Sequence, residues 1–408
     1  MHKRVHLAVV AVCLALATAA GAQPSSTTEI AAIRGEIAAL VQRLERLEQA
    51  TGVTAAAAEP APTASPPPAP QVLAATGEPA VRFSGDMRYR HESINEAGVD
   101  ERSRHRIRAR FGVAADVGDD VRVGLTLATG GDDPVSANQT LDGGFDRDSI
   151  GVDRAFFSWQ ATEQLSFIGG KMANPFFRPG NHHLIYDGDL NPEGLALRFA
   201  GGNWFANYAG LWVEERAAAD DSLLLGGQFG YRRSLDNGMR VTAGAGYYDY
   251  LQTQGQTPFY DGSPNGNRVD AAGNYLNDFN EAQLFAELSL KPGDRAVTVF
   301  ADYVTNTEAD EANGGFAVGA SLGEVSRPGT WRLGYAYQDL EADAVIATFT
   351  DSDWAGGGTD GKGHVVEFNY GLRDRLVFGF RYFLNERGAF AGDEHDYNRL
   401  QADINFAY

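Results

Sequence analysis

The final twelve residues, 397–408, alternate between apolar and polar side chains. From Leu400 onward every second residue is apolar, through Ile404 and Phe406 to the terminal Tyr408, whereas the residues between them are mostly polar. Because successive side chains of a β-strand point to opposite faces, this pattern predicts a strand with one apolar and one polar face. Similar alternation recurs at 239–248, 281–290 and 376–385.

From residue 80 onward, short and long connections alternate between the predicted strands. The short ones carry residues favoured in tight turns, as in Asp236-Asn-Gly238 and Arg327-Pro-Gly329. Seven short and eight long connections join sixteen strands, which is the layout of an outer-membrane β-barrel. The expected fold is therefore an all-β, transmembrane antiparallel β-barrel over 80–408. A soluble β-sandwich or β-helix would also alternate, but would not explain the alternating connection lengths or the terminal aromatic residue.

The N-terminal part of the chain has a different pattern. A basic start, an apolar run and Ala20-Gly-Ala22 predict a secretory signal peptide over 1–22. Residues 23–52 carry apolar side chains three and four apart, which predicts a short coiled-coil helix; a lone amphipathic helix is the alternative. The Ala- and Pro-rich segment 53–79 predicts an extended linker.

The composition bears on two further points, nucleic-acid binding and disulfide bonds. The chain has 408 residues and a formal net charge of −20 at pH 7, which, with an export signal, argues against nucleic-acid binding. Its one cysteine, Cys13, lies in the predicted signal peptide, so the exported chain would have no disulfide bond. An exported protein of this kind needs another source of rigidity, and a closed, hydrogen-bonded barrel supplies one.

A dense run of arginines lies between residues 102 and 110. At a period of two they share one face of a strand, and arginines of three neighbouring strands join them. The resulting basic wall consists of Arg82, Arg88, Arg90, Arg104, Arg106, Arg108, Arg110, Arg122 and Arg399. Because an arginine facing lipid at mid-depth costs roughly 2–4 kcal/mol, we expect the wall to line the lumen. The alternative is that these arginines are only solvated and paired with acids such as Asp86.

Three motifs suggest other chemistry, but their contexts do not support it. Gly319-Ala-Ser-Leu-Gly323 matches the nucleophile elbow of hydrolases, yet no helix is expected after it. Asp187-Gly-Asp-Leu-Asn191 starts like a calcium loop, but Pro192 stands where that loop needs glycine. His182 and His183 have no cysteine or further histidine nearby. The sequence predicts no catalytic set, no metal site and no cofactor.

Eight short motifs lie mainly in the first half of the predicted barrel. They are Arg88-Tyr-Arg90, Arg106-Ile-Arg-Ala-Arg110, Ala128-Thr-Gly130, Asp133-Pro-Val135, Asn138-Gln-Thr140, Gly170-Lys-Met-Ala-Asn-Pro175, Asp189-Leu-Asn-Pro-Glu-Gly194 and Trp212-Val-Glu-Glu-Arg216. Together they resemble the bacterial putative-porin family of 16-stranded outer-membrane barrels. A coiled coil before a barrel is also similar, more distantly, to the phosphate-selective porins.

This resemblance implies roles for one loop and for the last strand. In porins the third long loop, here 174–192, folds inward, so Asp187, Asp189 and Glu193 are expected to face the basic wall at a constriction. The alternative is an external loop above the rim. Opposed charges across a constriction set up a transverse field that filters polar solutes. The barrel-assembly machinery is expected to read the last strand through Ile404, Phe406 and Tyr408.

The expected function is passive diffusion of small hydrophilic solutes through a water-filled channel with an arginine-lined lumen and an anion preference. The resemblance also implies a homotrimer in outer-membrane lipid, with the coiled coil as a periplasmic stalk. One alternative is a phosphate- or oxyanion-selective porin. Others are an outer-membrane lipase or protease, for which the sequence offers no convincing catalytic set, and a structural envelope tether.

Overall fold

The computed structural model describes residues 80–408 except 218, 236, 237 and 294. The predicted signal peptide, coiled-coil stalk and linker lie outside these residues, so they stay predictions. Where the structure describes the chain, no helix is both long and apolar enough to cross a membrane.

The described residues form one antiparallel sheet of seventeen strands, of which sixteen are long. The strands are β1 (Ala80–Glu96), β2 (Arg102–Val117), β3 (Val121–Thr129), β4 (Gln139–Thr140), β5 (Ile150–Gln160), β6 (Leu165–Lys171), β7 (Glu193–Gly201), β8 (Trp204–Glu214), β9 (Ser222–Ser234), β10 (Arg240–Leu251), β11 (Phe279–Leu290), β12 (Val297–Asn306), β13 (Gly314–Gly323), β14 (Trp331–Leu340), β15 (Gly361–Arg373), β16 (Leu376–Arg387) and β17 (His395–Ala407).

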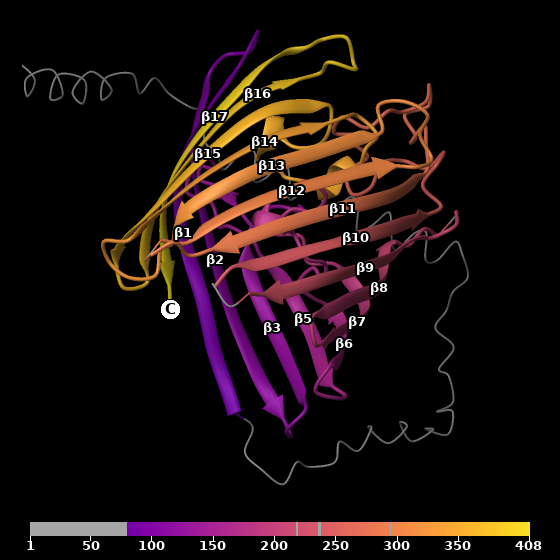
Figure 1. Ribbon diagram of the computed structural model, residues 1–408. Coiled ribbons are helices and arrows are strands. Elements are labelled where there is room, and N and C mark those ends of the chain that lie inside the picture. The colour runs from indigo at the N-terminus through magenta and orange to yellow at the C-terminus, as the bar shows by residue number, and fades with distance from the viewer. Residues whose placement is uncertain (1–79, 218, 236–237, 294) are drawn as a thin grey trace, which may run out of the picture. The chain divides into compact units, whose positions relative to one another are not determined.

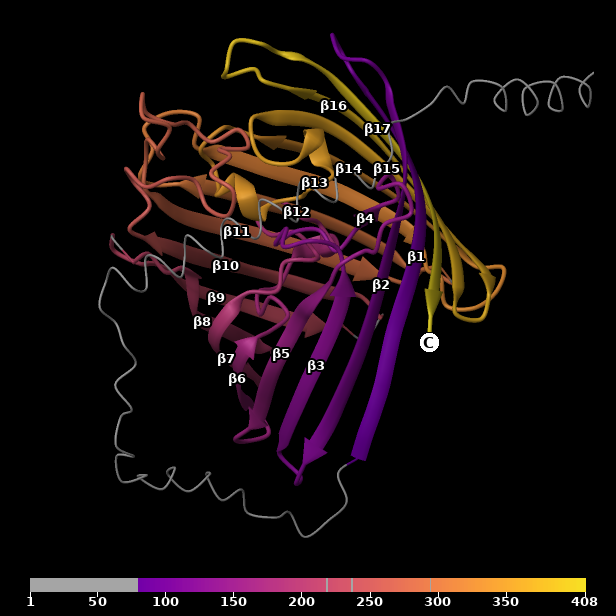
Figure 2. The ribbon, with the colours of Figure 1, turned by 180° about the vertical axis from the view of Figure 1, so that it is seen from behind.

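The sheet closes on itself. β1 pairs with β2 on one side and with β17 on the other, so that Asp86 lies opposite both Arg110 and Ala407. Views from opposite sides show the continuous wall (Figures 1 and 2). The two-residue strand β4 pairs with β2 beyond the end of β3 and does not interrupt the ring. The prediction of a 16-stranded antiparallel barrel is confirmed.

Side chains along each strand alternate between the two faces of the wall. In β12, Val299 and Tyr303 are exposed on the outer face, whereas Phe300 and Val304 point inward and are buried. Outward-facing aromatic side chains also stack in pairs, as Trp204 does on Phe229. An apolar outer face suits the hydrocarbon core of a membrane.

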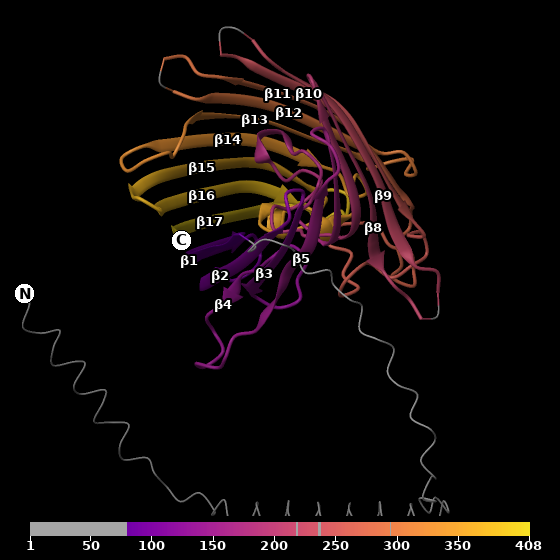
Figure 3. The ribbon, with the colours of Figure 1, turned by 90° about the horizontal axis from the view of Figure 1, so that it is seen from below.

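Three long loops carry the candidate functional site. We name them L2 (130–149), L3 (172–192) and L7 (341–360). L3 contains the short helix η1 (Pro179–Asn181), and L7 contains η2 (Ala347–Phe349) and η3 (Trp354–Gly356). Seen from below, parts of L3 and L7 lie inside the ring of strands (Figure 3). The barrel interior is therefore partly filled by loops.

Candidate functional site

L3 crosses the inside of the barrel to the opposite wall. The backbone N–H of Phe177 donates to Gln228 Oε1 of β9 at 2.7 Å, and the Gln228 amide donates to the Phe177 carbonyl at 2.9 Å. Three residues further on, the Gly180 N–H donates to Glu287 of β11 at 2.8 Å. These bonds to inward-facing side chains hold L3 across the lumen, so it is not an external loop.

The far end of L3 packs directly on the wall. Gly180 has a φ of +64°, and a Cβ there would lie 2.2 Å from the Phe300 ring of β12. Glycine meets both demands, the left-handed backbone and the close approach. The neighbouring His182 ring hydrogen-bonds Gln338 of β14 at 2.7 Å. L3 therefore divides the interior of the barrel.

L7 also folds inward, which the sequence analysis did not predict. Val345 and Ile346 are fully buried, and the Ile346 N–H donates to Glu281 of β11 at 3.0 Å. The Thr350 hydroxyl donates to the carbonyl of Leu184 in L3 at 2.9 Å. The signal that could have revealed this is the apolar run 344–347, because a hydrated outer loop has no need of one.

Most arginines of the predicted basic wall lie side by side on neighbouring strands. Arg88 of β1 lies opposite Arg108 of β2, Arg90 lies opposite Arg106, and Asp403 of β17 lies opposite Arg90. L3 and L7 contact this same face. The period-two pattern thus placed these side chains together. Their ion pairs, however, separate them into three sets.

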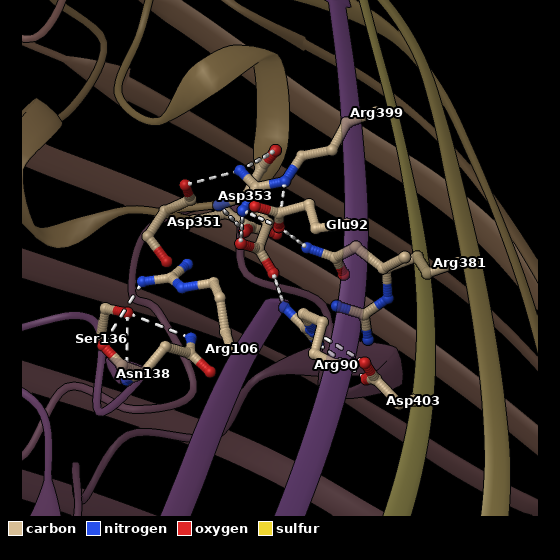
Figure 4. Close-up of polar contacts among 12 residues, drawn as sticks. Arg90, Glu92, Arg106, Ser136, Asn138, Asp351, Asp353, Arg381, Arg399 and Asp403 are labelled. Carbon is tan, nitrogen blue, oxygen red and sulfur yellow. Dashed lines mark hydrogen bonds and ion pairs between the residues drawn. The ribbon is translucent and has the colours of Figure 1, made fainter. Parts of the chain in front are cut away.

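The first set anchors L7. Arg90 donates to both oxygens of Asp403 at 2.7 and 2.8 Å and pairs with Asp353 of L7 at 3.0 Å (Figure 4). Arg399 donates from Nε to Glu92 at 2.7 Å and pairs with Asp353 at 2.6 Å. Arg90 and Arg399 are each 3% exposed and Glu92 is fully buried. These arginines hold a loop and do not line open water.

Charges within this first set balance. Arg104 also pairs with Glu92, so three arginines (Arg90, Arg104 and Arg399) meet three carboxylates (Glu92, Asp353 and Asp403). Burial opposes ionisation of Asp353, but the guanidinium groups of Arg399 and Arg90 hold the pKa of that carboxyl well below its usual range. Ion pairs between fully charged side chains therefore hold L7 against the wall.

The second set joins the wall to L3. Arg108 and Arg110 both pair with Asp86, at 3.1 and 2.8 Å, and both approach Asp189 of L3, at 3.3 and 3.4 Å. Two arginines therefore meet two carboxylates, and the set is neutral overall. The predicted contact between Asp189 and the basic wall is present here.

The third set has no carboxylate partner. Arg88 donates to the side-chain oxygen of Asn138, and Arg106 donates to the Asn138 backbone carbonyl at 3.4 Å. Within the described residues, neither guanidinium forms an ion pair, and the Nε–H groups of both lack a hydrogen-bond partner. Both side chains remain partly exposed. The wall therefore keeps two guanidinium groups that have no direct ion-pair partner among the described residues, both beside L2.

Two predicted members of the wall lie apart from it. Arg82 and Arg122 both pair with Asp116, at 2.6 and 2.7 Å, near the short turn 118–120. Their side chains are 58% and 50% exposed. This corrects the prediction that they belong to one basic wall: alternation fixed their face, but not how far along the strand they lie.

The predicted constriction acids also separate. Glu193 does not face the basic wall; it begins β7, lies opposite Lys171 of β6 and accepts a hydrogen bond from it at 2.9 Å. Asp187 is buried, and its carboxylate accepts the Ser352 N–H of L7 at 2.9 Å. Only Asp189 reaches the arginines. The turn of L3 around Asp187 decides this, and the sequence spacing does not encode it.

Asp187 belongs to a buried group at the contact of L3 with L7. The Nδ1 atom of His183 lies 3.6 Å from Asp351 Oδ2, and ligand atoms of His183, Asp187 and Asp351 lie within 4.8 Å of one another. Burial raises the pKa of Asp187 to about 7. Burial opposes the charged form of both His183 and Asp351, but their mutual contact raises the pKa of His183 and lowers that of Asp351.

The last strand completes the barrel wall. Ile404 lies opposite Tyr89 and Phe406 opposite Met87, on the outer face. Tyr408 exchanges backbone hydrogen bonds with Gly85, and its hydroxyl donates to the Arg110 carbonyl of β2 at 3.1 Å. A Cβ on Gly85 would lie 2.3 Å from the Tyr408 ring. The terminal aromatic thus crosses β1 at its one glycine.

Cavities remain on both sides of L3. One, of about 580 Å³, lies among L2, L3 and the neighbouring wall and is lined by Asp132, Asp133, Asp153 and Asp189. Another, of about 500 Å³, reaches the short turn 161–164 and includes Arg178, Arg198 and Arg232. Solutes therefore meet acidic and basic surfaces on opposite sides of the loop.

Comparison with known proteins identifies relatives of this architecture. A model of the putative porin family matches residues 93–274 and 268–408. The barrel of Pseudomonas putida OprB aligns with a TM-score of 0.57 and 12% identity, over 80% of this chain and 94% of that one. Salmonella typhi OmpF, in complex with daunomycin, aligns with a TM-score of 0.52 and 12% identity, over 80% and 97%. No curated protein sequence matches.

Proposed function

Because the chain belongs to the putative porin family, we propose that it forms a diffusion channel for small hydrophilic solutes that prefers anions. Family and fold together identify an outer-membrane channel protein and not an enzyme. The preference for anions rests on one observation, the two arginines without carboxylate partners, Arg88 and Arg106.

The physical reason lies in the charge balance of the wall. The sets around Glu92 and Asp86 are neutral, so within the basic wall the unbalanced charge comes from the guanidinium groups of Arg88 and Arg106. A positive surplus in a narrow, water-filled passage lowers the barrier for anions and raises it for cations. The net charge of −20 does not oppose this, because many acids lie in loops where salt screens them over about 8–10 Å.

Planar-bilayer recording tests this proposal. Purified protein should give discrete conductance steps, and a KCl gradient should give a reversal potential on the anion side, since K⁺ and Cl⁻ have nearly equal mobility in water. Absence of any conductance from correctly folded barrel would contradict the channel proposal. A reversal potential on the cation side would contradict only the anion preference.

An oxyanion-selective porin is a narrower candidate. Arg88 and Arg106 both contact Asn138, so one oxyanion could accept hydrogen bonds from two guanidinium groups. If the channel favours oxyanions, millimolar phosphate should reduce the chloride current and the R88S/R106S variant should lose this block. Equal currents with and without phosphate would leave a general anion channel.

We also propose a homotrimer that assembles through the barrel, with residues 23–52 as a periplasmic stalk. The family membership and the exposed apolar outer wall support it. Protein lacking residues 24–70 should still migrate as a trimer in native gels. Migration as a monomer alone would mean that the stalk, and not the barrel, drives trimer assembly.

The C-terminal strand is proposed as the segment that the barrel-assembly machinery reads. Its pairing with β1 removes two open strand edges, which a lipid environment does not tolerate. Deleting Phe406–Tyr408 should abolish heat-modifiable barrel in outer membranes, whereas deleting three exposed residues of the loop 388–394 should not. Normal barrel in the truncated strain would contradict this role.

A further inference from the structure

The contact between L3 and L7 gathers three side chains of a kind that bind metals. His183 and Asp187 come from L3, and Asp351 comes from L7, 164 positions beyond Asp187 in the chain. We propose that these three residues bind one divalent transition-metal cation, such as Zn²⁺, which ties L3 to L7 inside the barrel.

The mixed donor set favours this class of ion. One imidazole nitrogen and two carboxylate oxygens suit Zn²⁺ or a related first-row cation better than Mg²⁺ or Ca²⁺, which prefer oxygen alone. The three ligand atoms lie within 4.8 Å of one another. Donors around an ion at about 2.0–2.2 Å lie roughly 3–4 Å apart, so the ligand atoms would have to approach one another by roughly 1–2 Å to close the site.

Both carboxylates are buried without a matching cation. Asp187 is 6% exposed and Asp351 is 8% exposed. Among the described residues, neither forms an ion pair with an arginine or lysine, and the one basic contact is His183 with Asp351. Arg178 has an electrostatic effect on both carboxylates and Arg381 on Asp351, but among the described residues neither guanidinium forms an ion pair with them. A divalent ion between Asp187 and Asp351 would stabilise both buried carboxylates in their ionised form.

The surrounding backbone holds the donors in place. Asp187 accepts the N–H groups of Asp189 at 2.7 Å and Ser352 at 2.9 Å, and Asp351 accepts that of Asp353 at 2.9 Å. A carboxylate has about four lone-pair sites, so each keeps capacity for an ion. Such outer bonds orient metal ligands in known sites.

The cluster also adjoins a cavity with room for water ligands. A water-sized cavity of about 70 Å³ adjoins the cluster and is lined by His183 and Asp351, as well as by Arg381 and Glu367 of the wall. Three protein ligands would leave one or more coordination positions open toward this cavity. The proposed site thus joins the two loops at a point that solvent reaches.

Metal titration of the untagged, folded barrel in detergent tests the proposal. Zn²⁺ should bind with a stoichiometry of one per chain by calorimetry, and Co²⁺ should give visible d–d bands. H183Q, D187N and D351N should each weaken Zn²⁺ binding at least tenfold. The adjacent variant H182Q, and E193Q in the same loop region, should bind Zn²⁺ as the wild type does.

A second measurement needs only the wild-type chain. Zn²⁺ should slow hydrogen exchange of the backbone around 183–187 and 349–353. Either of two results would overturn the proposal: no stoichiometric binding to the wild type, or protection confined to other segments. Because channel conductance is not the readout, failure here leaves the channel function untouched.

Discussion

The arginines of β1 and β2 look alike in the sequence, yet they divide into two kinds in the structure. Arg108 and Arg110 share Asp86 and Asp189 and join the wall to L3. Arg88 and Arg106, on the same face, have only the amide and carbonyl oxygens of Asn138 as hydrogen-bond acceptors within the described part of the chain. A run of like residues can therefore serve two purposes, one structural and one electrostatic.

The difference arises from where carboxylates reach the wall. Paired arginines lie next to acids of β1, β17, L3 or L7, and their charges cancel within a few ångströms. The unpaired ones lie beside L2, where the oxygens that they contact directly belong to the neutral Asn138. Pairing should determine stability, and the unpaired surplus should determine ion selectivity.

The largest expected effect is on stability, from E92Q. Glu92 is fully buried and accepts from Arg104, Arg399 and Gln401. Removing its charge leaves Arg104 without a carboxylate partner, while Arg399 keeps Asp353, and the one uncompensated buried charge should lower the free energy of unfolding by about 3–5 kcal/mol. Urea-induced unfolding in lipid vesicles, followed by tryptophan fluorescence, measures this. The control E193Q removes an exposed ion pair with Lys171 and should lower the free energy of unfolding by less than about 1 kcal/mol. Equal losses of stability for E92Q and E193Q would contradict the claim that the buried pairs determine stability.

A smaller effect is expected from D86N, which converts paired arginines into unpaired ones. Arg108 and Arg110 would keep only Asp189 as an ionic partner. One added positive charge about 10 Å from a passing ion changes its energy by about 0.4 kcal/mol in a water-like dielectric, or roughly twofold in permeability. The reversal potential of D86N should therefore indicate a stronger anion preference than that of the wild type. A shift toward cations would mean that Asp86 is not neutralised by its partners.

The smallest expected effect is that of salt on the D86N difference. The screening length falls from about 10 Å at 0.1 M to roughly 3 Å at 1 M. The D86N shift should shrink accordingly when both sides of the bilayer are raised to about 1 M KCl at a fixed concentration ratio. A shift of constant size would indicate that pore shape, and not charge, differs between the variants.

Sequence reasoning could predict the barrel because its signals are local. Alternation with a period of two, turn residues between strands and the terminal Tyr408 each act within a few neighbours. The same period placed Arg88, Arg90, Arg106 and Arg108 on one face. The number of strands, and the face of each strand on which a side chain lies, could therefore be predicted from the sequence alone.

The partners of those arginines could not be predicted in the same way. Asp353 reaches Arg90 across 263 positions because L7 folds inward, and no periodic pattern records that fold. Asp189 and Glu193 lie four residues apart, but the path of L3 sends one to Arg108 and the other to Lys171. The tertiary fold of the loops, which depends on many weak contacts, determines which basic residue each of these carboxylates contacts.

The most direct test of the account compares two double variants in a KCl gradient across a planar bilayer. R88S/R106S removes both unpaired charges, whereas R108S/D86N removes an arginine and a carboxylate together and leaves the net charge unchanged. The reversal potential of R88S/R106S should shift toward cations, because about 0.4 kcal/mol per charge lowers the permeability of the anion roughly fourfold and raises that of the cation by a similar factor. That of R108S/D86N should stay at the wild-type value. Equal reversal potentials for R88S/R106S and the wild type would contradict the claim that Arg88 and Arg106 set the selectivity.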